Sequence, residues 1–170
     1  MTHLGRSAVT GWDIYSVCSD APGFDLPTFH PPSAHFVCLL DWDASAASDV
    51  QIDALARHLL DAGAVMLCCR GEDSARVCER FAAVIGGGER GVARPEIAVC
   101  DLPGLVPEAV AFVLDAACPA PRYLAQCAAV LALVIGADVY RLAMVELAIA
   151  THLLRGGDPP GAPGVARLRA

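Results

Sequence analysis

Four short apolar runs in this chain each stop at an acidic, glycine or proline turn, and each is followed by a segment with helical periodicity. The runs occupy residues 34–40, 64–69, 97–100 and 128–135. Apolar runs of this length between turn residues are typical of strands that are buried on both faces. Strands alternating with helices form a mainly parallel sheet, so this rhythm predicts an α/β fold.

The segments after the runs have the apolar spacing of helices that cover a sheet. Residues 49–60 place five apolar side chains on one side of a helix: Ile52, Leu55, Ala56, Leu59 and Leu60. Residues 74–85, 107–117 and 138–154 repeat this pattern. We therefore expect a three-layer αβα sandwich whose mainly parallel sheet has four to five strands. Flavodoxin-like and Rossmann-like strand orders both remain open, because they produce the same rhythm.

Composition divides the chain into three parts. Residues 1–33 contain four prolines, so we expect an irregular N-terminal segment with a possible edge strand at 12–18. Residues 34–155 form the predicted α/β domain. Residues 156–170 are rich in glycine, proline and alanine, and we expect a disordered tail there. A length of 170 residues fits one domain with a substantial core.

Charge and residue usage exclude several classes of function. The net charge of −7 and the pI near 5.0 argue against a nucleic-acid binder, which needs basic residues to neutralise phosphates. All 12 basic residues are arginine. A Walker phosphate loop and a pyridoxal Schiff base both require lysine, so neither is possible in this chain.

Eight cysteines occur in a chain whose first ten residues lack the apolar core of a signal peptide. We expect reduced thiols, a cytoplasmic location and mostly buried cysteines. The adjacent pair Cys68 and Cys69 lies in a predicted strand, so its side chains should face opposite sides of the sheet.

The apolar stretch 124–154 has the length of a membrane span, but Gly136 and Asp138 divide it into a buried strand and a capped helix. We therefore expect no membrane association.

Within residues 139–154, one predicted inner face comprises Val139, Leu142, Ala143, Ile149, Ala150 and Leu153. Met144, Val145 and Leu147 are apolar outside that face, so the helix should be covered on two sides. The cover is either a second copy, giving a homodimer through residues 139–154, or the loop 1–33.

Ligands of open parallel sheets bind at the carboxyl ends of the strands. The residues after the four predicted strands are mostly acidic: Asp41, Asp43, Glu72, Asp73, Asp101 and Asp138, with Arg70 and Ser74 among them. Clustered carboxylates suit Mg²⁺, and Asp41, Asp43 and Asp101 are the candidate metal ligands. The alternative, which we prefer, is that these residues cap helices and accept bonds from free backbone N–H groups.

The segment 36–43, an apolar strand ending Asp41-Trp42-Asp43, resembles the first motif of the haloacid-dehalogenase-like phosphatases. The resemblance implies that Asp41 is a nucleophile and Asp43 a general acid. Cys69-Arg70 stands where that family has Thr or Ser, and no lysine is present. From 34 to 154 the order of elements, with the turn 70–77 and the run 131–136, also resembles small bacterial α/β proteins known only as a domain of unknown function.

Together these patterns favour a non-catalytic binding or accessory module of a bacterial cytosolic system, without a cofactor and self-associating. It would bind a protein partner through the acidic edge, with Arg70, Glu72, Asp73 and Ser74, or through the last helix. The alternative is a Mg²⁺-dependent enzyme of phosphoryl transfer or phosphate-ester hydrolysis that uses Asp41 and Asp43.

Overall fold

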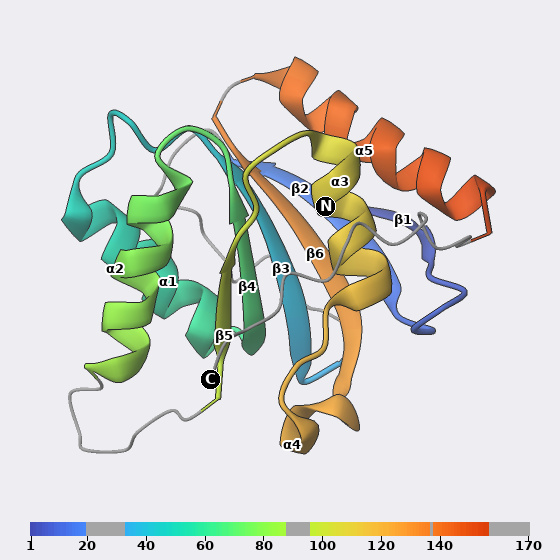
Figure 1. Cartoon of the computed structure of the whole chain (residues 1–170), viewed down its shortest axis with the longest axis horizontal. Coiled ribbons are helices and arrows are strands. Elements are labelled where there is room, and N and C mark those ends of the chain that lie inside the picture. Colours follow the sequence, from blue (N-terminus) through green and yellow to red (C-terminus); the bar gives the residue numbers. More distant parts are fainter. Residues whose placement is uncertain (20–32, 88–95, 137, 157–170) are drawn as a thin grey trace, which may run out of the picture.

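The computed structural model describes residues 1–19, 33–87, 96–136 and 138–156. A six-stranded sheet lies between two layers of helices (Figure 1). The strands are β1 (Thr2–Arg6), β2 (Asp13–Ser19), β3 (His35–Trp42), β4 (Ala64–Arg70), β5 (Ala98–Asp101) and β6 (Cys127–Ile135). The helices are α1 (Asp49–Asp61), α2 (Ser74–Gly86), α3 (Val106–Ala111), η2 (Phe112–Ala116, a π-helical turn), α4 (Pro121–Leu124) and α5 (Val139–Leu154). The predicted disordered tail lies, apart from Gly156, outside the described residues.

The strand order is β1-β2-β6-β3-β4-β5, and only β1 runs antiparallel to its neighbour. From β3 the chain moves outward to β4 and β5, then crosses back to place β6 on the other side of β3. These four strands follow the Rossmann-like order, not the flavodoxin-like one. The direction of winding reverses between β3 and β6, at the position where such sheets usually bind ligands.

The α/β class and the αβα arrangement are confirmed, but the sheet has six strands and not four to five. The additional strand is β1, whose residues are exposed or half-buried and lack an apolar run. A strand is present close to the predicted residues 12–18, but it does not lie at the edge of the sheet. That strand, β2, pairs with β1 on one side and with β6 on the other.

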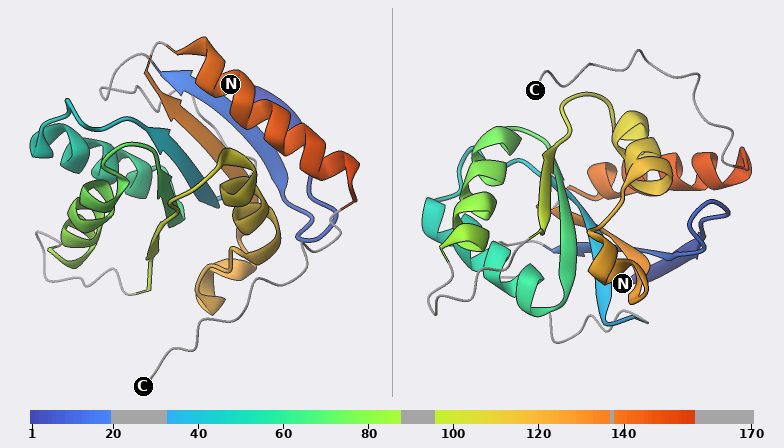
Figure 2. Two further views of the ribbon diagram at one scale, coloured as in Figure 1. Left: turned by 45° about the horizontal axis from the view of Figure 1, so that its top comes forward. Right: turned by 60° about the horizontal axis from the view of Figure 1, so that its bottom comes forward.

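The two faces of the sheet have separate cores, and Figure 2 shows that helices cover both faces. One core packs beneath α1 and α2, and the other packs beneath α3, η2 and α5. The central strands β3 and β6 are buried almost throughout because both faces are covered. Within the described residues, no helix is long and apolar enough to cross a membrane.

Helix α1 forms where its sequence predicts it. Ser48 caps its N-terminus through a capping box with Gln51. The predicted apolar stripe is the buried one: Ile52, Leu55, Ala56, Leu59 and Leu60. Helix α2 is likewise where the periodicity places it, with Val77 and Phe81 buried.

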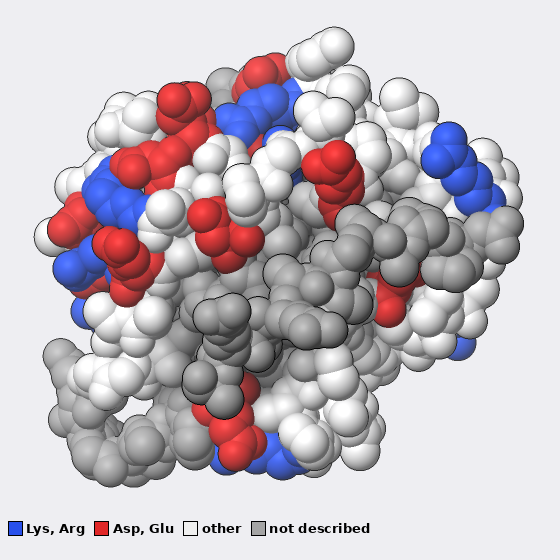
Figure 3. All heavy atoms as spheres, in the orientation of Figure 1, with Lys and Arg blue, Asp and Glu red and all other residues white. Residues whose placement is uncertain are grey.

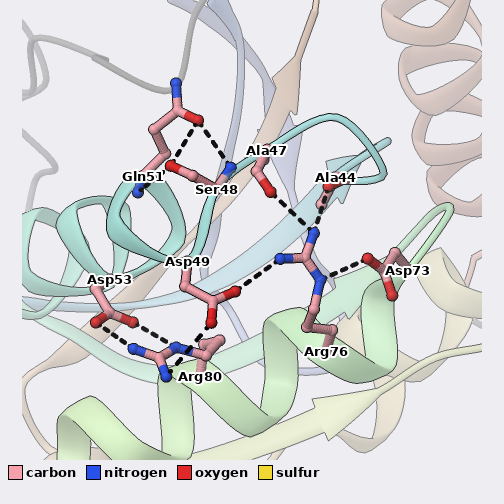
Figure 4. Close-up of polar contacts among 9 residues, drawn as sticks. All are labelled: Ala44, Ala47, Ser48, Asp49, Gln51, Asp53, Asp73, Arg76 and Arg80. Carbon is pink, nitrogen blue, oxygen red and sulfur yellow. Dashed lines mark hydrogen bonds and ion pairs between the residues drawn. The ribbon is translucent and has the colours of Figure 1, made fainter.

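Ionic contacts join α1 to α2 on the outside of this layer (Figure 4). Arg76 donates to the carboxylates of Asp49 and Asp73 at 2.8 and 2.6 Å. Its other bonds reach the backbone carbonyls of Ala44 and Ala47, which precede α1. One guanidinium on α2 therefore holds the loop that starts α1.

Arg80 lies one turn further along α2 and pairs with Asp53 of α1. Its Nε donates to Asp53 Oδ1 at 2.9 Å, and its Nη2 donates to Oδ2 of the same carboxylate. This bidentate bond is the main reason why the pKa of Asp53 is lowered from its ordinary value of 3.8. The charged form of Asp53 is thus favoured in the folded state.

We predict that Asp53 makes the stability of the protein dependent on pH in the acid range. Because its pKa is lowered on folding, its contribution is complete above pH 3.8 and is lost as the pH falls through the folded-state pKa. Urea unfolding at several pH values measures this for the native chain and for Asp53→Asn. The difference between the two should shrink below pH 3.8. A difference that stays constant down to the acid transition would contradict the assignment.

Candidate functional site

The carboxyl end of β3 carries a buried charge. Asp41 is 1% exposed, and it accepts hydrogen bonds from two arginines. Arg70 ends β4 and lies beside Asp41 in the strand register, and its Nη1 donates to Asp41 Oδ2. Arg141 reaches across from the first turn of α5, and its Nη2 donates to Asp41 Oδ1. Since a buried carboxylate is costly unless paired, Asp41 depends on both partners.

Further contacts hold the two guanidinium groups in place. Arg70 Nη2 donates to the carbonyl of Gly104 at 3.2 Å, which fixes the loop after β5. Arg70 Nε is buried and has no hydrogen-bond partner among the described residues. The side chains of Arg70 and Arg141 are 14% and 25% exposed, so this ion cluster is largely shielded from water. A shielded cluster is stronger and less sensitive to salt than a surface pair.

Gly71 is required for this arrangement. Its φ is +111°, and a Cβ at this position would lie 2.2 Å from the carbonyl oxygen of Trp42. The same Cβ would lie 3.0 Å from Nη2 of Arg141. Glycine therefore allows β3, β4 and the arginine to approach one another.

Asp43 has a different set of partners. Its Oδ1 accepts from the backbone N and the Oγ of Ser45, at 3.1 and 2.6 Å. The bond from the Ser45 hydroxyl is the main cause of the lowered pKa of Asp43, and the charge of Arg141 contributes a smaller effect. Asp43 is exposed and stabilises the turn before α1.

The remaining predicted site residues surround the start of α2. Asp101 accepts from the hydroxyl of Ser74 at 2.6 Å, so the end of β5 is bonded to the first turn of α2. Asp73 has a φ of 63° and pairs with Arg76 instead of capping α2. Glu72 is exposed, and its carbonyl oxygen accepts from the backbone N of Ala44 at 3.1 Å.

The capping interpretation is confirmed only at some positions. Asp138 caps α5, because its Oδ1 accepts from the backbone N of Tyr140 at 2.9 Å. Asp73 occupies the N-cap position of α2 without making a side-chain cap bond.

The sequence did not indicate that Asp41 is the centre of an ion cluster. Its partner Arg141 lies 100 residues away and belongs to no motif.

The geometry offers little for a divalent cation. Asp41, Asp43 and Asp101 bond to different partners: two arginines, Ser45 and Ser74. In the part of the chain that the structure describes, no group of three or more His, Cys, Asp or Glu side chains could hold a metal ion. The positive charges that Mg²⁺ would supply at Asp41 are supplied by Arg70 and Arg141.

A second candidate surface is the outward side of α5. The exposed residues of this helix are all apolar or aromatic, and we call them the α5 outer face: Val139, Tyr140, Ala143, Met144, Leu147, Ala150 and Leu154. Leu147 and Leu154 are 62% and 88% exposed. The predicted inner face was therefore wrong for Val139, Ala143 and Ala150.

The charged side chains of α5 explain this orientation. Arg141 bonds to Asp41, and Glu146 accepts from the buried hydroxyl of Ser16 at 2.6 Å. His152 Nε2 lies 2.9 Å from Asp115 of η2. These polar side chains are directed inward beside Ile149 and Val145, which is buried although the sequence pattern placed it outside the inner face, and much of the remaining apolar surface faces outward.

In comparisons of sequence and fold, the chain matches no protein-family model, no curated protein and no solved structure. Neither resemblance seen in the sequence is therefore supported by a family match.

We predict that Asp41→Asn lowers the free energy of unfolding by about 3–5 kcal/mol, because it leaves two shielded guanidinium groups without a counter-charge. Asp43→Asn at the exposed neighbouring carboxylate is the matched control and should cost much less. Urea unfolding measures both. If Asp41 instead belonged to a cluster of carboxylates built for a metal, these charges would repel one another in the absence of metal. Asp41→Asn would then raise the free energy of unfolding. A rise in the melting midpoint with millimolar Mg²⁺ that Asp41→Asn abolishes would also contradict our interpretation.

We predict that Gly71→Ala destabilises the protein by at least ~2 kcal/mol, because the new Cβ meets a backbone carbonyl at a positive φ. Gly11→Ala is the control, since Gly11 has a φ of +71° and no described atom lies within 4 Å of the position that a Cβ would occupy there. That change should cost about 1 kcal/mol, the strain of the left-handed conformation alone. Urea unfolding of the two variants gives the comparison. Equal costs at the two sites would show that the close approach at Gly71 has no energetic role.

Proposed function

We propose that this protein is a non-catalytic binding or accessory module that self-associates through the α5 outer face. The observation that carries the proposal is the absence of charge from the exposed side of α5: Arg141, Glu146 and His152 are turned inward beside the buried Val145 and Ile149, and the α5 outer face is apolar. A helix at the surface of an isolated domain normally has charged and polar residues on its outer side. In Figure 3 the charged side chains crowd over α1 and α2 on the left, whereas the surface over α5 at the upper right is mostly uncharged.

The spacing of the exposed residues favours a second copy as the partner. Tyr140, Met144, Leu147 and Leu154, with half-buried Thr151 between the last two, follow the alternating steps of four and three that form the seam of paired helices. A pair of α5 helices related by a two-fold axis would match each stripe with itself. The α5 outer face contains no charge that would select a partner of opposite charge.

The size of the surface indicates a weak dimer. A helix of 16 residues is about 24 Å long, so a single α5–α5 contact buries on the order of a few hundred Å² per partner. A standard stable interface buries about 800 Å² per partner. We therefore expect association that depends on concentration in the micromolar range or above.

The carboxyl edge contributes less to this proposal than the sequence suggested. Of the predicted binding residues, Arg70, Asp73 and Ser74 bond to Asp41, Arg76 and Asp101 of the same chain. Glu72 and Asp73 are exposed, and Glu72 lies outside these side-chain bonds. We assign this edge a structural role. A protein partner that binds at Glu72 is the second candidate.

The alternative of a Mg²⁺-dependent phosphoryl-transfer or phosphate-ester-hydrolysing enzyme requires Asp41 as a free nucleophile. Two hydrogen-bonded arginines reduce the nucleophilicity of this carboxylate and block both of its oxygens. Asp43 would have to leave Ser45 to act as an acid, and its lowered pKa is unsuited to that role. The binding module is the better account.

A bacterial cytosol remains the proposed setting. None of the eight cysteines is in a disulfide bond, and four of them are buried. Free thiols in this number fit a reducing compartment. The bacterial source depends on the sequence resemblance alone.

We predict that Leu147→Arg weakens self-association by ~tenfold or more, because it places a charge in the centre of the apolar contact. Sedimentation equilibrium over a wide concentration range measures the dimer dissociation constant. Val50→Arg is the matched control, because Val50 is an apolar residue of α1 that is 76% exposed on the charged side of the molecule. That variant should associate like the native chain. A native chain that stays monomeric at the highest concentration would refute the homodimer and leave the α5 outer face to a different protein.

A further inference from the structure

Four cysteines form two pairs around strand β4: two lie in β4 itself, one in β5 and one in α2. Cys68 and Cys69 are buried on opposite faces of β4, which confirms the expectation for adjacent strand residues. Cys68 belongs to the core beneath α3 and α5, and Cys69 to the core beneath α1 and α2. Each has a second cysteine close by: Cys100 of β5 for Cys68, and Cys78 of α2 for Cys69. Neither pair has a role in the sites described above.

The first pair is built into the sheet. Cys68 and Cys100 are register partners on neighbouring parallel strands, and Cys100 packs against the same core as Cys68. Neighbouring strands lie about 4.8 Å apart. This spacing is within the Cα separation of about 4.4–6.8 Å that a disulfide requires. The short strand β5 is at the edge of the sheet, so it can adjust its position more easily than a central strand.

The two thiols of this pair differ in their environment. Cys68 is fully buried, whereas Cys100 is partly exposed at the edge. The hydrogen bond between them favours the thiolate of Cys100 and lowers its pKa to about 7. The same bond, with burial, raises the pKa of Cys68. The pair thus combines a partly exposed thiol whose ionisation is favoured with a buried thiol whose ionisation is not, which is the arrangement of an attacking and a resolving cysteine.

The second pair is the less reactive of the two. Asp101 is the register partner of Cys69, on the α2 side of β5. Its negative charge opposes the thiolate of Cys78 and raises the pKa that the bond from Cys69 lowers. Among the described residues no carboxylate has this effect on Cys100, where burial is the opposing influence. The strand register and this difference in environment together favour the pair of Cys68 and Cys100 over that of Cys69 and Cys78.

We propose that Cys68 and Cys100 form a redox-active pair that closes to an intramolecular disulfide when a hydroperoxide oxidises the protein. The Cys100 thiolate attacks the peroxide oxygen, the O–O bond breaks, and after uptake of a proton the products are a sulfenic acid and water or an alcohol. The Cys68 thiol then attacks the Cys100 sulfur, the S–S bond forms, and the hydroxyl leaves as water with the proton of Cys68. The protein loses two electrons, which the peroxide takes up. A dithiol reductant reverses the reaction by thiol–disulfide exchange.

The test is a peptide map of the oxidised protein. Trypsin leaves Cys68 and Cys69 in a peptide that ends at Arg70, and leaves Cys100 and Cys118 together in one that ends at Arg122. We would therefore use Cys118→Ser, which removes the exposed thiol from the second peptide. After one equivalent of hydrogen peroxide and alkylation of the free thiols, the two peptides should be found linked. Fragmentation should assign the bond to Cys68.

Two variants and one titration complete the test. In the same background Cys100→Ser should abolish the linked peptide, and Cys78→Ser should leave its yield unchanged. The rate of alkylation of Cys100 should rise with a midpoint near pH 7, which requires no further variant. A bond between Cys69 and Cys78, oxidation of Cys100 to a sulfinic acid without a bond to Cys68, or an alkylation midpoint near the ordinary thiol value of 9.0 would overturn the proposal.

Discussion

The bond network of Asp41 ties helix α5 to the ends of β3 and β4, two strands that are already paired by backbone hydrogen bonds. Its carboxylate lies at the end of β3, and its partners come from β4 and from α5 on the other side of the switch point. Burial makes these bonds necessary, because a shielded carboxylate without counter-charges would be expensive. Open α/β sheets usually keep this position free for a ligand. Here the protein's own arginines, Arg70 and Arg141, occupy it.

The two sides of the sheet differ in how they use charge. On the side of α1 and α2, arginines and aspartates pair across the helices at the surface, while apolar residues face the sheet. On the side of α5, the charged residues are directed inward to Asp41, Ser16 and Asp115. The first arrangement is typical of a helix layer that faces water. The second leaves an apolar surface on the outside of α5, and the bond between Arg141 and Asp41 joins the inner side of this helix to the ion cluster.

Local patterns predicted much of the fold and little of the site. The periodicity of residues 49–60 identified the buried face of α1, because that face is set by 3.6 residues per turn. The same reasoning misjudged α5, where Val139 and Ala150 are exposed. Most side chains of that helix are apolar, so periodicity alone cannot select the inner face. Strand β1 was missed because an exposed five-residue strand has no apolar signal and depends on pairing with β2.

Composition and local pattern were sufficient for the α/β rhythm, the position of the main helices and the exclusion of lysine-dependent chemistry, since these depend on residue types and on neighbours along the chain. The contacts between distant side chains became visible in three dimensions alone. Arg141 reaches Asp41 across 100 residues, and Cys68 lies beside Cys100 because β4 and β5 pair in one register and not in another. Such contacts follow from strand order and helix rotation. Both are fixed by the joint packing of two cores, which no local pattern contains.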